Sequence, residues 1–262
     1  MMPVFIHELK RNKIALLIWA LVIAGMLSLS IIIYPEMASE MDQFSEMFSN
    51  MGNFSSAFGM DQLNFGEYIG FFAVECGNVL GLGGSFFAAI TGISMLSKEE
   101  KDGTASFLLS HPISRKKIVF EKLISLYIQI LVLNLIVLSF ASIATFIIGE
   151  KIDIKLFLLI FLAYFLMQIE ISSISFGISA FLKTSGMGIG LGIALLFYFL
   201  NIVSNLTKEA KFLKYITPFG FTEGGDIIAN SSLEIKYLLV GLSFTIIGIF
   251  LAFYKYNKKD IA

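Results

Sequence analysis

Six long runs of uncharged, mostly apolar residues constrain the fold of this chain more than any other feature. A helix needs about 20 such residues to cross the roughly 30 Å hydrocarbon core of a bilayer. The predicted spans are 14–34, 75–97, 123–148, 156–182, 188–206 and 237–254. Because 56% of the 262 residues are hydrophobic and only 15% are charged, a soluble globular fold is excluded. The sequence therefore predicts an all-α integral membrane protein, a single domain over residues 1–262 with six transmembrane helices.

The distribution of Lys and Arg predicts the orientation of these spans. An even number of spans places both termini on one side, and the loops of that side hold 13 of the 19 Lys and Arg residues, against six on the other. Since cytoplasmic loops retain the cations, we expect both termini in the cytoplasm. The outer segment 35–67 has no Lys or Arg and several acidic residues. High Ile, Phe and Lys usage indicates an AT-rich bacterial genome, and hence a bacterial plasma membrane.

Charge and motif content exclude several classes of protein. The net charge of −1 provides no cationic field for nucleic acid. The single cysteine, Cys76, forms no intrachain disulfide, and no Cys/His spacing predicts a metal site. The sequence contains no G-x-x-x-x-G-K-[ST], H-E-x-x-H or G-x-S-x-G motif, so no catalytic residues are predicted. We expect a non-catalytic chain that binds no cofactor itself.

Three stretches outside the spans have patterns of their own. Residues 3–12 group apolar against charged side chains, which predicts a short helix in the cytoplasmic interface or, equally, a charged flank that only fixes topology. In 36–51, Met and Phe recur every three or four residues, which predicts an external helix with an apolar stripe. Residues 207–235 are moderately apolar and contain Pro218 and several glycines, so re-entrant helices are expected before the sixth span.

The cytoplasmic loop 98–122 carries the most local information. Gly103 and Thr104 can end one helix and start a short one, which continues until Pro112 stops it. Ser114 is then the predicted N-cap of the third span. The apolar residues of the short helix are Phe107, Leu108 and Leu109. Apolar side chains exposed to the cytosol suggest that another protein covers them.

Three motifs together resemble the permease subunits of type-2 ABC exporters. The sharpest is E-x-x-G-T-x-x-x-L-L-x-x-P-I-S-R-x-x-I at Glu100 to Ile118, which is similar to the loop between the second and third spans of that family. The opening HELKRNKIALLIW (7–19) and the later YITPFGF (215–221) also resemble it. The resemblance therefore covers the whole chain.

This resemblance implies a partner and a set of coupling residues. In the family, the loop is a coupling helix that docks on a separate ABC ATP-binding subunit, which binds ATP and Mg²⁺, and the permease pairs with a second copy or a paralogue. Phe107, Leu108 and Leu109 would be the docked face, and Arg115 to Lys117 would meet the partner or lipid headgroups, or would only fix topology. The implied coupling residues are Glu100, Gly103, Thr104, Phe107, Leu108, Leu109, Pro112, Ser114 and Arg115.

Polar and small residues inside the spans offer a second candidate site. Glu170 lies near the middle of the fourth span beside Gln168, and an ionisable group there faces protein or a water-filled cavity. It is either a substrate-path or gating residue, or a structural group that bonds a neighbouring helix, through Asn134 of the third span. Pairs of glycines with G-x-x-x-G spacing, such as Gly188 and Gly192, predict close helix packing and a dimer interface.

The most consistent function is the permease subunit of an ATP-driven exporter. Its acidic, Met- and Phe-rich outer segment and apolar spans suit a hydrophobic or amphipathic substrate, for example an antimicrobial or toxin-like peptide. One alternative is a gradient-driven secondary transporter or channel that uses Glu170. Another is a membrane-embedded sensor or scaffold that binds an ATP-binding subunit without transport.

Overall fold

A computed structural model describes residues 2–38, 63–64, 66–110, 112–184, 186–207 and 209–259, and only the backbone of Phe107, Leu109 and Ser110. Within these ranges the regular elements are all helical. Six helices are long and apolar enough to cross a membrane. They are α1 (Pro3–Ala38), the continuous α4 (Tyr68–Cys76), η2 (Gly77–Gly81) and α5 (Leu82–Ser94), then α8 (Arg115–Ile148), α9 (Ile154–Ser179), α10 (Met187–Leu206) and α12 (Ile235–Lys258). The all-α fold with six spans is confirmed.

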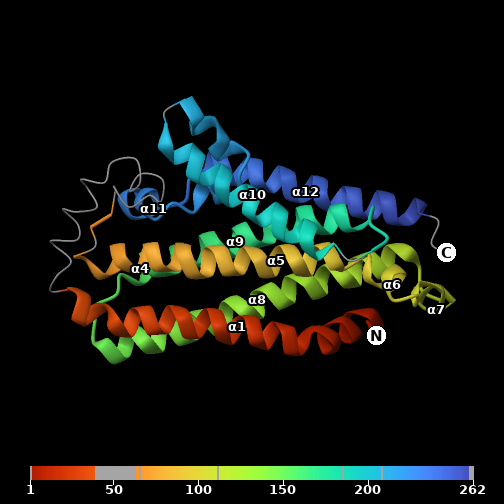
Figure 1. Ribbon diagram of the computed structural model, residues 1–262, viewed down its shortest axis with the longest axis horizontal. Helices are drawn as coiled ribbons and strands as arrows, with labels where there is room; N and C mark the ends of the chain where they lie inside the picture. The colour runs from red at the N-terminus through yellow and green to blue at the C-terminus, as the bar shows by residue number, and fades with distance from the viewer. Residues whose placement is uncertain are drawn as a thin grey trace.

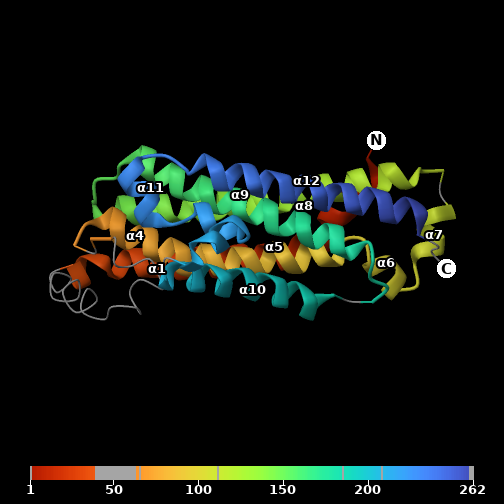
Figure 2. The ribbon, with the colours of Figure 1, turned by 90° about the horizontal axis from the view of Figure 1, so that it is seen from above.

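The helices run along the long axis of the molecule and form two recognisable ends (Figure 1). Both termini lie at the end that carries α6 (Lys98–Lys101) and α7 (Ala105–Ser110), which we call the terminal end. The start of α4 and the short α11 (Gly224–Asn230) lie at the opposite end. Helix α1 packs mainly on α8, and α9 packs between α5 and α12. Figure 2 shows α10 along one edge of the bundle.

Side-chain and glycine caps set the limits of the two longest central helices. The Ser114 hydroxyl accepts a hydrogen bond from the Lys117 N–H at 3.3 Å and begins α8, which confirms the predicted N-cap. Gly149 ends that helix in the left-handed region, with φ of 74°, where glycine carries no steric penalty. Asp153 caps α9 by accepting from the Lys155 and Leu156 N–H groups at 3.0 and 3.2 Å.

The N-terminal segment differs from the separate interfacial helix that the sequence suggested. Residues 3–12 are the first turns of α1, which continues without a break into the first span. Its first turn is capped from another helix, because the buried Glu121 carboxylate of α8 accepts hydrogen bonds from the Val4 and Phe5 N–H groups at 2.9 and 3.1 Å. These bonds hold the start of α1 against α8 instead of leaving it free to lie along the bilayer surface.

The two other stretches of interest are described to different extents. Residues 39–51 of the expected Met/Phe helix lie outside the described residues, and residues 36–38 are the end of α1. Before the sixth span, the chain forms the short helices η3 (Glu209–Tyr215), η4 (Pro218–Phe221) and α11; that they are re-entrant stays a prediction. The Thr217 hydroxyl fixes them to α10 by donating to the Phe197 carbonyl at 2.8 Å.

Close packing between α9 and α12 depends on facing glycines, which leads to a stability prediction. A Cβ at Gly177 would lie 2.6 Å from the backbone oxygen of Gly248, so Gly177→Ala forces the two helices apart. We expect it to reduce the free energy of unfolding in detergent by about 1–3 kcal/mol. Gly25→Ala on α1 is the matched control, because an added Cβ there meets nothing within 4 Å. Equal stability of the two variants would contradict this packing.

Candidate functional site

The short helix between the second and third spans forms where the sequence predicts it. Gly103 has a φ of +68°, a conformation that favours glycine, and turns the chain after α6. Helix α7 begins directly after Thr104, whose carbonyl accepts from the Leu108 N–H at 3.0 Å, and it ends before Pro112. We call residues 98–114 the α6–α7 segment. It lies at the terminal end of the bundle (Figure 1).

The apolar side chains of α7 are only partly described. The side chains of Phe107 and Leu109 lie outside the described part of the chain. Leu108 is half-buried and, with Ile113, packs against the main hydrophobic core. Leu108 is therefore directed toward the bundle rather than freely projecting into solvent.

Leu108 lines a groove between the start of α1 and the α6–α7 segment, which we call the terminal-end groove. Its volume is about 560 Å³. Val4, Leu108 and Ile113 contribute apolar side chains, whereas His7, Arg11 and Asp102 contribute polar ones. Arg11 donates a hydrogen bond to Asp102 at 2.5 Å and thereby lowers the pKa of that exposed carboxyl. The groove thus combines apolar and charged contact groups at the terminal end of the bundle.

A cluster of four charged side chains lies beneath this groove, and we call Glu8, Lys98, Glu99 and Lys122 the buried ion cluster. Lys122 of α8 is fully buried. Its Nζ donates to Glu8 Oε1 of α1 at 2.8 Å, to Glu99 Oε1 of α6 at 2.5 Å, and to the Met95 carbonyl at 2.6 Å. Lys98 donates to the other oxygen of Glu8. The α6–α7 segment is therefore joined to α1 and α8 through ion pairs removed from water.

Two residues of the family-like motif bind the C-terminal part of the chain. Glu100 forms an ion pair with the buried Lys259, whose Nζ also donates to the Leu182 carbonyl at 2.6 Å. Arg115 donates from Nη1 to the carbonyls of Lys259 at 2.6 Å and Asn257 at 3.3 Å, at the negative end of α12. Arg115 thus has an intramolecular role, whereas the sequence indicated contact with the partner, contact with lipid headgroups or a purely topological role.

The three polar residues predicted inside the spans do not form one cluster. Asn134 Nδ2 donates to Gln168 Oε1 at 2.7 Å, so Asn134 bonds Gln168 and not Glu170. Two residues along a helix turn the side chain by about 200°, and the buried Glu170 accordingly faces Gly241 of α12 while Gln168 faces Gly84 of α5. The expected link between Asn134 and Glu170 is wrong. None of the three residues lines the terminal-end groove or the second cavity, which is described next.

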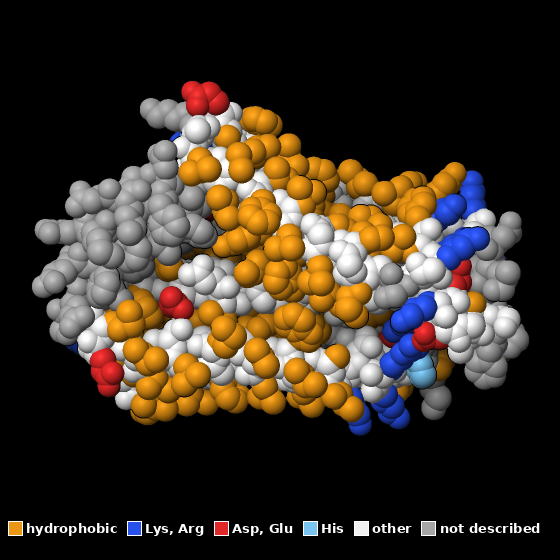
Figure 3. All heavy atoms as spheres, viewed as in Figure 1, with side chains coloured by type: hydrophobic (Ala, Val, Ile, Leu, Met, Phe, Trp, Pro, Cys, Tyr) orange, Lys and Arg blue, Asp and Glu red, His pale blue; other side chains and the backbone are white. Residues whose placement is uncertain are grey.

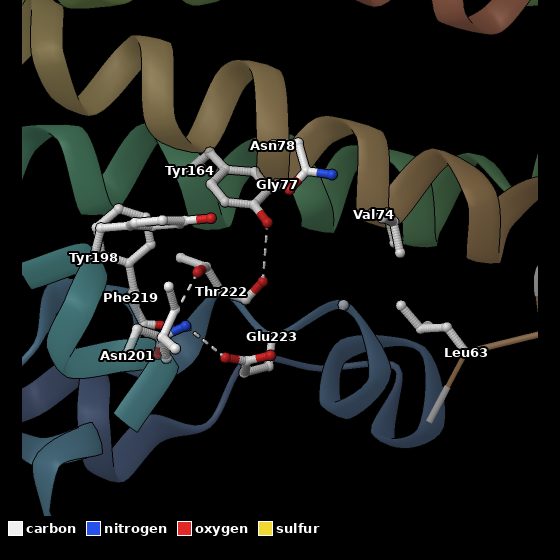
Figure 4. A pocket seen from close by; sticks show the side chains of 13 residues that line it. Leu63, Val74, Gly77, Asn78, Tyr164, Tyr198, Asn201, Phe219, Thr222 and Glu223 are labelled. Atoms are coloured by element: carbon white, nitrogen blue, oxygen red, sulfur yellow. Dashed lines mark hydrogen bonds between the residues drawn. The ribbon is translucent and has the colours of Figure 1, made fainter. Parts of the chain in front are cut away.

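A cavity of about 60 Å³ lies toward the opposite end, and we call it the Glu223 cavity (Figure 4). Asn201 and Asn205 of α10 each donate from Nδ2 to Glu223 Oε1 at 2.8 Å. On another side, the Tyr164 hydroxyl of α9 donates to the Thr222 carbonyl at 3.3 Å. The π-helix η2 also contributes to the wall through Gly77, and π-helical turns occur frequently at functional sites. No spacing in the sequence indicates this cavity, because its walls come from segments far apart in the chain.

The surface divides in the way expected of a membrane protein. In the view of Figure 3, hydrophobic side chains cover the middle of the molecule. Lys and Arg gather at the terminal end with a few acidic side chains among them, and other acidic side chains lie toward the opposite end. In the described ranges, no group of three or more His, Cys, Asp or Glu side chains could hold a metal ion.

Comparison with known proteins identifies the family. The family model described as ABC-2 family transporter protein matches residues 2–261, nearly the whole chain. The comparison with curated proteins found no match. A fold with six membrane-spanning helices agrees with the family match. The chain belongs to the ABC-2 family of transporter proteins, as a multi-pass membrane protein of the permease type.

Proposed function

We propose that this chain is the non-catalytic permease subunit of an ATP-driven exporter, and that a separate ABC subunit binds ATP and Mg²⁺ and hydrolyses the nucleotide. The observation that carries this proposal is the α6–α7 segment, which holds a short helix at the cation-rich end and is bonded through α6 to α1, to α8 and to the residue that ends α12. A rigidly attached docking element is what a permease needs in order to receive mechanical work from a partner. By the distribution of cations, the terminal end faces the cytoplasm of a bacterial cell.

The docking surface consists of α7 and the adjoining terminal-end groove. The groove offers apolar contacts at Val4, Leu108 and Ile113 and charged contacts at its polar side chains, a mixture typical of protein interfaces. We expect the apolar residues of α7 and this groove to be covered by the ATP-binding subunit. The exposed Thr104 and Pro112 limit α7 and set its position on that surface.

Movement of the α6–α7 segment would be transmitted through its ion pairs. Glu99 would pull on Lys122 of α8, and Glu8 of α1 would follow through the same ammonium group. On the other side, Glu100 and Arg115 would transmit the displacement to the end of α12. Closure of the ATP-binding subunits would thereby change the packing of the first, third and sixth spans together.

Transport requires a path, which we place between two permease subunits. An added Cβ at Gly188 or Gly192 of α10 would meet nothing within 4 Å, so this G-x-x-x-G face is open for a second helix. A hydrophobic or amphipathic substrate, for example an antimicrobial or toxin-like peptide, would leave between the subunits or laterally into lipid. The gradient-driven alternative receives less support, because Glu170 lines neither the terminal-end groove nor the Glu223 cavity.

Affinity isolation from gently solubilised native membranes tests the proposal. We expect an ABC ATPase to co-purify with the chain and amphipathic peptides to raise its rate of ATP hydrolysis. Isolation of the intact permease without any ATPase, combined with substrate movement that follows an ion gradient, would contradict the proposal and favour the Glu170-dependent transporter. An ATPase that co-purifies but responds to no substrate would favour a sensor.

A further inference from the structure

We propose that the Glu223 cavity binds a primary ammonium group of the transported substrate. This inference rests on the proposed function and specifies the substrate class further, as an amphipathic molecule with an amine. The cavity lies between α10, α9 and the π-helical turn η2, and η4 with the residues that follow it forms another wall. Asn201 is five residues from the end of α10, which corresponds to about 8 Å along the helix. The site is therefore near the outer end of the proposed path.

The charge of the cavity favours a cation. Glu223 is half-buried, and both of its described hydrogen-bond donors, Asn201 and Asn205, are neutral amides. No Lys or Arg is among the 13 lining residues. Among the ion pairs of the described residues, none involves this carboxylate. A carboxylate at such a depth attracts a positive group strongly, because solvent screening is reduced there.

The hydrogen-bonding groups favour a cation that carries N–H donors. Asn201 uses its amide nitrogen for Glu223, and its Oδ1 is buried without a hydrogen-bond partner. A buried acceptor of this kind is costly unless a donor reaches it. Figure 4 shows the hydroxyl groups of Tyr164 and Tyr198 directed into the same space. A primary ammonium group has three N–H donors and could satisfy Glu223, Asn201 and one tyrosine oxygen together.

The size and the aromatic walls agree with this ligand. About 60 Å³ is enough for several water molecules, so the cavity accommodates an ammonium head with its first methylene. Tyr198 and Phe219 form an edge-to-face pair with ring centroids 5.7 Å apart, and both rings line the cavity. Aromatic faces attract cations through their quadrupole, and they also provide apolar contacts for the carbon next to the nitrogen. The remainder of the substrate would extend outside the cavity.

Binding of labelled butylammonium to the full-length protein in zwitterionic nanodiscs tests the proposal. We expect saturable binding of one butylammonium per chain in equilibrium dialysis, with butan-1-ol unable to compete. Glu223→Gln should weaken binding at least tenfold while keeping an oxygen that accepts from the two asparagines. The control Glu209→Gln makes the same charge change at the same end, on an exposed residue outside the cavity, and should change binding less than twofold.

A second variant keeps the test decisive if Glu223→Gln does not fold. Tyr198→Phe retains the ring and removes one acceptor, and it should weaken butylammonium binding about two- to fivefold. Absence of saturable binding to the unmodified protein, or equal affinity of the Glu223→Gln and Glu209→Gln variants, would overturn the proposal. Loss of butylammonium binding in a preparation that keeps its ABC ATPase would refute only this subsite. Butylammonium binding without any associated ATPase would refute the proposed function instead.

Discussion

Replacing Lys122 by methionine is expected to lower the free energy of unfolding by about 3–5 kcal/mol. The substitution keeps most of the side-chain volume but removes the ammonium that pairs with Glu8 and Glu99, both of which are almost fully buried. Removing one partner of a buried ion pair is strongly destabilising, because the remaining charge has neither water nor a counter-ion. Lys98 still pairs with Glu8, so the loss falls mainly on Glu99. Thermal or denaturant unfolding of the purified protein in detergent measures the effect.

Two further variants identify the cause of that loss. Lys116→Met removes the same charge from an exposed position of the same helix and should change stability by less than about 0.5 kcal/mol. Adding Glu99→Gln to Lys122→Met should recover part of the lost stability, since no unpaired carboxylate remains at that position. If Lys122→Met and Lys116→Met unfold alike, the buried ion cluster does not hold the α6–α7 segment.

Replacing Leu108 by aspartate is expected to reduce co-purification of the ABC ATPase at least tenfold. Among the described side chains of α7, Leu108 is the apolar one that lines the terminal-end groove. A docked partner would remove water from a carboxylate at this position without supplying a counter-ion, which is energetically costly. Truncation or charging of a central apolar contact commonly costs 2 kcal/mol or more in an interface, which is more than a tenfold change in affinity. Quantitative mass spectrometry of the affinity-isolated complex provides the measurement.

The matched control for this prediction lies on the same short helix. Ser106→Asp adds the same charge two residues away, at an exposed position on the other face of α7. It should leave the amount of co-purified ATPase within twofold of the unmodified protein. Equal amounts of ATPase with Leu108→Asp and with Ser106→Asp, at equal expression, would show that Leu108 is not part of the docked surface.

Much of the fold could be predicted because the bilayer imposes a simple length and polarity requirement. Each of the six apolar runs overlaps one of the helices, although the first three helices begin 7 to 11 residues before the predicted runs. Local chemistry was equally informative around α7, because Gly103 lies at the predicted break between two helices and Ser114 caps the third span. These features depend on residues close together in the sequence, where capping and turn preferences decide the structure.

Features that depend on distant residues could not be predicted from one sequence. Lys98 and Lys122 belong to the excess of Lys and Arg from which the orientation is predicted. Lys122 nevertheless pairs inside the protein with Glu8, which is 114 positions away. The Glu223 cavity combines residues from several segments, so no local spacing indicates it. The sequence correctly indicated that Glu170 is buried. Which helix its side chain faces depends on how α9 is rotated about its own axis, and in the structure the side chain faces α12.

A single cross-linking measurement tests most directly the central claim, that the α6–α7 segment docks on a separate ATP-binding subunit. The only native cysteine, Cys76, is buried, so Ser106→Cys provides a unique site for a thiol-attached photo-cross-linker in intact cells. The same label on Ser232→Cys, at the opposite end, is the control. The account predicts a cross-link from position 106 to an ABC ATPase, and none from position 232. A cross-link to that ATPase only from position 232, or efficient labelling at position 106 with lipid as the sole product, would contradict it.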